Sequence, residues 1–151
     1  MKRLFLYFTL SLFCFSCSTI LKRNNKIKKS EASLIPDAPG AKEKINIISK
    51  KKYFERISAT ANNYIRMVPV LMRDPRHAGH DYYRFFDIQE DSIYSLIGLK
   101  NNDIVVSANN YVVPGQRVFW EYIKYLPKVT DPKIEIIRNS EPLILKYMLI
   151  D

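Results

Sequence analysis

The hydrophobic and polar positions in the C-terminal part of the chain change period several times, which predicts short helices and strands in succession. Apolar residues at helical spacing predict a helix over residues 51–63. The run "IRMVPVLM" at 65–72 then predicts a strand, in which Pro69 indicates an edge position or a bulge because it has no N–H. A polar loop follows at 73–81, and the aromatic-rich run "YYRFFDIQ" after it predicts a second strand.

A short helix and a tight turn come next. Asp91 or Ser92 can cap a helix with an apolar face, and Gly98 can take the left-handed conformation that ends it. Asn101 and Asn102 follow this glycine, and asparagine accepts positive φ more readily than other residues with a side chain. The pattern therefore predicts that the chain reverses here and enters a new strand.

The rest of the pattern completes an α+β order. "DIVVSA" at 103–108 is apolar on both faces, as expected for a central strand, and Asn109-Asn110 predicts a second turn. Residues 116–127 carry an apolar stripe at helical spacing, formed by Phe119, Ile123 and Leu126. The last two apolar runs flank Asn139-Ser140 and predict a hairpin. The order indicates an α+β domain in which a small curled antiparallel sheet, or partial barrel, is capped by two helices and preceded by another.

Charge divides the chain into unequal parts. The 151 residues carry a net charge of +9, but residues 57–151 hold eleven basic and eleven acidic side chains. Residues 22–56 hold eleven basic and four acidic ones. This excess, together with two prolines and no sustained periodicity before residue 50, predicts a disordered linker over 18–50 and a domain over 51–151. Because the domain itself is neutral, nucleic acid is not an expected partner.

Residues 1–17 have the composition of an export signal. Lys2 and Arg3 precede a mainly apolar run that ends in Ser16-Cys17, and this part is similar to bacterial lipoprotein signals. That similarity implies lipidation of Cys17, an anchor in the cell envelope and a domain in the periplasm. The alternative is an uncleaved membrane helix over 4–21, against which the lysines and arginines that directly follow it argue.

Three stretches together resemble a bacterial PDZ domain: "SIYSLIGLKNNDIVVSANNYVV", the amphipathic helix after it, and "KIEIIRNSEPLILKYML". The helix, the "VP" strand and the "YRFF" strand that precede them are similar to the C-terminal PDZ domain of type II secretion system protein C. Asn102, Asn110 and Ser140 stand where that family has glycine, and Tyr83 also replaces a glycine.

The resemblance implies a binding module. PDZ domains add an extended segment of a partner to a strand edge beside a helix, and the resemblance places this groove between two sets of residues, namely Tyr83, Arg84, Phe85 and Phe86 on the strand and Val118 and Tyr122 on the helix. The implied partner is a secretion-system component or an exported protein. The alternatives are a structural lipoprotein without a groove function and an adaptor for a periplasmic protease.

Enzyme chemistry finds little support in the sequence. The chain has no Gly-x-Ser-x-Gly motif and no phosphate-binding loop, and no paired carboxylates stand in a credible cleft. His77 and His80 lie in a polar loop without further ligands, so surface positions are a better interpretation than a metal site. We therefore expect binding, with no catalysis, no cofactor and no metal.

Overall fold

The computed structural model describes residues 34–77 and 80–151. They belong to one compact unit, Ala32–Asp151. The predicted signal, the lipidation site Cys17 and the first part of the predicted linker lie outside the described residues. In the part of the chain that is described, no helix has both the length and the apolar character needed to cross a membrane.

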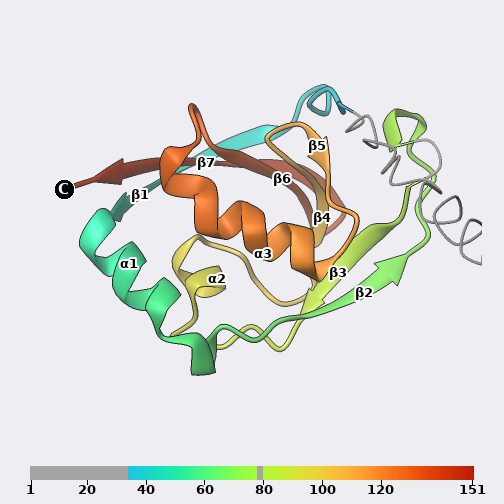
Figure 1. Cartoon of the computed structure of the whole chain (residues 1–151). Helices are drawn as coiled ribbons and strands as arrows, with labels where there is room; N and C mark the ends of the chain where they lie inside the picture. The colour runs from blue at the N-terminus through green and yellow to red at the C-terminus, as the bar shows by residue number, and fades with distance from the viewer. Residues whose placement is uncertain (1–33, 78–79) are drawn as a thin grey trace, which may run out of the picture. The chain divides into compact units, whose positions relative to one another are not determined.

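The domain is built on one mixed, open seven-stranded sheet (Figure 1). Six strands follow the order β1-β7-β6-β4-β3-β2, and β5 pairs with β4 beside this path. The β1–β7 pair is parallel and all the others are antiparallel. The strands are β1 (Lys42–Ser49), β2 (Arg66–Val70), β3 (Tyr82–Phe86), β4 (Ile104–Ala108), β5 (Tyr111–Val112), β6 (Lys133–Arg138) and β7 (Glu141–Ile150).

Three α-helices lie on one side of this sheet, α1 (Lys50–Ser58), α2 (Ile93–Leu96) and α3 (Gln116–Tyr125) (Figure 1). Short 3₁₀ turns occupy Thr60–Asn62, Pro75–His77 and Leu126–Lys128. The predicted α+β class is confirmed, with the sheet mixed rather than purely antiparallel. The predicted first helix ends earlier than expected, at Ser58.

The main core fills the space between the helices and the sheet. Its fully buried side chains come from every layer, and they include Tyr53, Phe85, Tyr94, Phe119, Ile123, Ile134 and Leu145. The ring of Phe119 on α3 lies 5.0 Å from that of Phe85 on β3, and the Tyr53 hydroxyl of α1 donates to the Ile123 carbonyl. Burying an aliphatic or aromatic side chain stabilises a fold by about 1.5–3 kcal/mol, so this layer holds the helices on the sheet.

The predicted linker is wrong over its last part, because residues 42–49 form β1 and pair with β7. Ile48 of this strand is buried in the core. Three charged residues at the start of the strand interrupt the hydrophobic pattern from which a strand is predicted. Two of them form exposed ion pairs with β7, Lys42 with Glu141 at 2.6 Å and Glu43 with Lys146 at 2.8 Å. A strand on the edge of a sheet can carry such charges on its exposed positions.

The predicted turns are confirmed by the backbone. Gly98 has φ +86° at the exit of α2, and the Ser92 hydroxyl caps this helix by accepting the Ser95 N–H at 3.1 Å. Positive φ also occurs at the positions that bracket β4 and close the β6–β7 hairpin, which are Asn102, Asn109, Asn110, Asn139 and Ser140. β4 is buried at all five positions, as its apolar pattern predicted.

Candidate functional site

The strand that was predicted to offer an open edge lies inside the sheet. β3 pairs with β2 along its whole length, from Tyr82 to Phe86. On its other side it pairs with β4 at Tyr83 and Arg84, and the Phe85 N–H donates to the Asp103 carbonyl at 2.9 Å. The prediction that Tyr83–Phe86 receives an added strand is therefore wrong, because both edges of β3 have neighbours.

Side chains of β3 also divide between the two faces of the sheet. Phe85 is buried under α3, and the Tyr83 hydroxyl donates to the Pro114 carbonyl at 3.0 Å just before that helix. Arg84 packs on the opposite face, since successive side chains of a strand alternate. Phe86 lies under the guanidinium of Arg66, which is 4.7 Å from its ring centre. These four residues do not line one groove.

The two helix residues predicted for the groove lie on the other side of α3. The Tyr122 hydroxyl donates to the Lys133 carbonyl at 3.0 Å and to Asn109 Oδ1 at 3.3 Å, so this side chain ties α3 to the start of β6. Burial raises the pKa of the Tyr122 phenol well above its ordinary value. Val118 precedes it by four residues and shares this side of α3, with 47% of its surface exposed. Neither residue belongs to the hollow described below.

β2 provides the open edge on this side of the sheet. It stands at the end of the strand order, and among the described strands it pairs only with β3 (Figure 1). Backbone groups on the outer side of an edge strand are free to pair with another chain. Pro69 lies in this strand, so the edge position predicted from its missing N–H is confirmed.

A hollow of about 520 Å³ lies beside the segment that leads into β2. One side is formed by the residues before β2 and by α2, and the other by the first half of α3. Its lining consists of Thr60, Asn63, Tyr94, Gln116, Arg117 and Trp120. Trp120 is half-buried, and its ring centre lies 6.1 Å from that of Tyr94, so the hollow has an aromatic wall.

Asn63 fixes the shape of this hollow. Its side-chain nitrogen donates to the carbonyls of Arg56 and Ile57, at 2.8 and 3.3 Å, where α1 ends. Its side-chain oxygen accepts the Ile93 N–H at 2.9 Å, where α2 begins. One asparagine thereby joins two helix ends to the start of the edge strand, so the wall is preformed.

The rim of the hollow is positively charged. Arg117 is exposed, and within the described residues it forms no ion pair. A guanidinium in this position is suited to a carboxylate, to which it can donate two parallel hydrogen bonds. The arrangement can therefore hold an apolar or aromatic side chain against Trp120 and an acidic group against Arg117.

Sequence reasoning missed Asn63, Gln116, Arg117 and Trp120. The buried stripe of α3 was read correctly, since Phe119 and Ile123 are fully buried. Residues 117 and 120 flank this stripe on one side, and residues 118 and 122 flank it on the other. Only the position of β2 decides which flank faces an open strand edge. The single tryptophan of the chain, half-buried on a polar flank, was the available signal.

Compared with known proteins, the sequence matches no family model and no curated protein. Within residues 34–77 and 80–151, no group of three His, Cys, Asp or Glu side chains is placed to hold a metal ion. The geometry of the β2 edge and its hollow therefore carries the functional argument.

Proposed function

We propose that this chain is a membrane-tethered, PDZ-like protein-interaction module, a component or accessory of bacterial type II protein secretion. It binds an extended segment of a partner by strand addition in the periplasm. The observation that supports this proposal most directly is that the open edge of β2 (Arg66–Val70) begins beside the aromatic hollow on α3. Strand addition uses both parts, because backbone hydrogen bonds give affinity and a neighbouring pocket selects side chains.

The proposal also rests on the resemblance seen in the sequence. A PDZ-like groove lies between a strand and a helix, and the proposal assigns these roles to β2 and α3 in place of β3 and α3. The preferred segment carries an apolar or aromatic residue for the wall of Trp120 and an acidic group, or a C-terminal carboxylate, for Arg117.

Site-directed photo-crosslinking in the full chain tests this groove. Tyr64 is 58% exposed just before β2, and Tyr111 is 48% exposed on β5, so each can be replaced by a photoreactive phenylalanine analogue. In native membranes, we expect the Tyr64 position to capture a partner and the Tyr111 position to capture none. The Trp120→Ala variant should remove most of the crosslink at position 64, whereas Val118→Arg should leave it unchanged.

Other outcomes of this experiment would contradict the groove or favour one of the alternatives. Equal capture at both positions, or capture at position 64 that survives Trp120→Ala, would contradict the groove. No capture at either position would favour the structural lipoprotein. A captured protease in place of a secretion component would favour the protease adaptor.

The anchor has its own test. Lipoprotein processing would place a lipid-modified Cys17 at the mature N-terminus, and mass spectrometry of the purified chain measures this directly. Cys17→Ser should abolish the modification and release the domain from the membrane fraction. An unprocessed N-terminus at Met1 would contradict lipidation and favour the membrane helix.

A further inference from the structure

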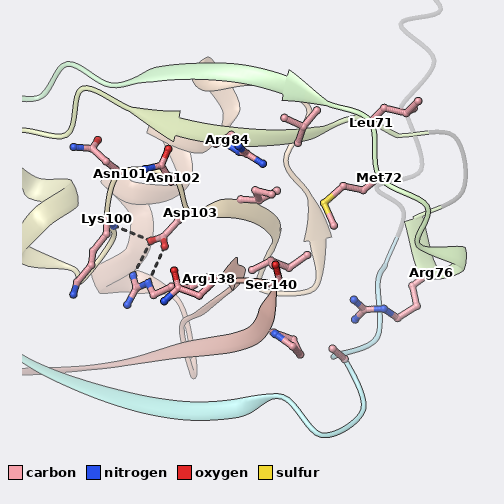
Figure 2. A pocket seen from close by; sticks show the side chains of 16 residues that line it. Leu71, Met72, Arg76, Arg84, Lys100, Asn101, Asn102, Asp103, Arg138 and Ser140 are labelled. Carbon is pink, nitrogen blue, oxygen red and sulfur yellow. Dashed lines mark hydrogen bonds and ion pairs between the residues drawn. The ribbon is translucent and has the colours of Figure 1, made fainter.

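A second hollow lies on the face of the sheet opposite the helices, about 730 Å³ in volume (Figure 2). Its walls come from the segment after β2, the turn before β4 and the turn of the β6–β7 hairpin. Four basic side chains and one acidic side chain line it. The volume is in the range of sites that bind small molecules, roughly 300–1,000 Å³.

Arg84 projects into this hollow from the middle of β3 (Figure 2). Its Nε is buried and has no hydrogen-bond partner, and no carboxylate in the described part of the chain pairs with its guanidinium. A buried donor without an acceptor costs about 1–3 kcal/mol, and more when it is charged. An anion in the hollow would satisfy it.

The carboxylate that lines the hollow is already fully engaged. Asp103 is 1% exposed, and Arg138 donates to both of its oxygens, each at 2.7 Å. The Lys100 backbone N–H donates to the same carboxylate at 2.7 Å (Figure 2). Asp103 therefore does not neutralise Arg84 or the Lys100 ammonium group, and these two positive charges remain without a counter-ion among the described residues.

The hollow also has an apolar wall. Val70, Leu71 and Met72 line it at the end of β2, and Leu71 is 96% exposed (Figure 2). Val70 and Met72 pack on a small buried cluster of the same face, formed by Tyr82, Ile104 and Val106. A single leucine on the surface is ordinary, but here it lines the hollow into which Arg84 projects. A ligand that meets both needs an anionic head and an apolar tail.

We propose that this hollow binds a phosphate monoester carrying a short apolar chain. The guanidinium of Arg84 is suited to two phosphate oxygens, and four basic side chains against one acidic side chain in the lining favour the charge of close to −2 on such a phosphate near neutral pH. The apolar chain lies against Met72 and Leu71. The site is separate from the β2 edge, because Arg84 and Arg117 are on opposite faces of the sheet.

Isothermal titration of the full chain in phosphatidylcholine nanodiscs tests the proposal, with hexyl phosphate, inorganic phosphate and hexanol as probes. Hexyl phosphate should bind at least about tenfold more tightly than either part alone, since its head and its tail both contribute. Arg84→Gln should weaken hexyl phosphate by at least about tenfold. Lys100→Gln, at an exposed position whose side chain points away from Arg84, should change it much less.

Two controls make the result specific. Leu71→Ser should weaken hexyl phosphate and leave inorganic phosphate unchanged. Arg117→Gln, on the other face, should change neither. Binding that survives Arg84→Gln, or hexanol binding as tightly as hexyl phosphate, would overturn the proposal.

A competition experiment distinguishes a lipid headgroup from a free ligand. Vesicles of phosphatidylcholine containing phosphatidic acid should compete with hexyl phosphate if the natural ligand is a membrane lipid. If hexyl phosphate binds and these vesicles do not compete, the ligand is a free phosphate ester. If neither binds, the hollow is not a phosphate site.

Discussion

The two faces of the sheet are stabilised in different ways. The face under the three helices is closed by aliphatic and aromatic side chains from nearly every element. The opposite face has a small apolar cluster and the buried carboxylate of Glu135, and a second buried carboxylate, Asp103, directly precedes β4; each is 1% exposed. Each carboxylate has an arginine partner, Arg76 for Glu135 at 3.0 Å and Arg138 for Asp103 at 2.7 Å.

This difference separates two physical sources of stability. Apolar burial on the helix side is nearly independent of pH and of salt. The two buried ion pairs balance a desolvation cost against Coulomb attraction, so removing one partner is expensive. Apolar packing under the helices therefore holds the fold together, and the ion pairs hold charges in place around a hollow. The predictions below test this contrast from the largest expected effect to the smallest.

Phe119→Ala should lower the free energy of unfolding by about 3–5 kcal/mol, because it removes a fully buried ring between Phe85 and Tyr94. Urea unfolding followed by circular dichroism measures the change, which should be the same at pH 5 and pH 7. Val118→Ala, one residue earlier and 47% exposed, is the matched control and should cost less than about 1 kcal/mol. Similar losses in both variants would contradict a core formed by one stripe of α3.

Asp103→Asn should cost about 3 kcal/mol, since it leaves the Arg138 guanidinium partly buried without its counter-charge. The same unfolding experiment measures it. Asp87→Asn is the control, because the Arg66–Asp87 pair has a similar N–O distance of 2.8 Å but about half of each side chain is exposed. Breaking that pair should cost less than about 1 kcal/mol. Equal costs would show that burial does not distinguish the two ion pairs.

Asp74 should make the stability depend on acid pH. Hydrogen bonds from Arg76 lower the pKa of Asp74 from 3.8 to about 2, and its side chain is 17% exposed. Because the folded pKa lies below the unfolded one, this contribution is fully present above pH 4 and is lost as the pH falls toward 2. It amounts to about 1–2 kcal/mol.

Unfolding curves between pH 2 and pH 5 check this contribution. Asp74→Asn should remove the part of the pH dependence that belongs to Asp74. Glu135 acts in the opposite direction, because burial raises its pKa and the folded state takes up its proton first. The comparison must therefore be made between the variant and the unaltered protein. Identical curves would contradict the coupling of Asp74 to Arg76.

The smallest effect is expected in an exposed turn. Ser140 has φ +65° in the exposed β6–β7 turn, a conformation that suits glycine. Ser140→Gly should raise the free energy of unfolding by about 1 kcal/mol, seen as a higher melting temperature. Asn139→Gly should change it less, because asparagine tolerates its φ of +53°. A destabilised Ser140→Gly variant would mean that the hydroxyl makes a contribution of its own.

The candidate site could be predicted only in part. The residues of β2, β3 and α3 were all assigned to their elements from the sequence, and α3 was given its correct buried stripe. The groove was nevertheless placed on Tyr83–Phe86, Val118 and Tyr122, because the pairing of β3 with β2 and the side of α3 that faces the edge strand are not local properties. The hollow around Arg84 was not predicted, since it joins three turns that are far apart in the chain.

What the sequence determined by itself is local. Helix caps, left-handed turns at Asn102 and Asn109, and the helical stripe of α3 depend on backbone preferences and spacing within a few residues. Only the tertiary structure decided that residues 42–49 form a strand, which strand is the edge, and which face Arg84 occupies. Those outcomes depend on pairing between residues about a hundred positions apart, such as Lys42 and Leu143. The hydrophobic pattern of one segment does not reveal which distant segment it will pair with.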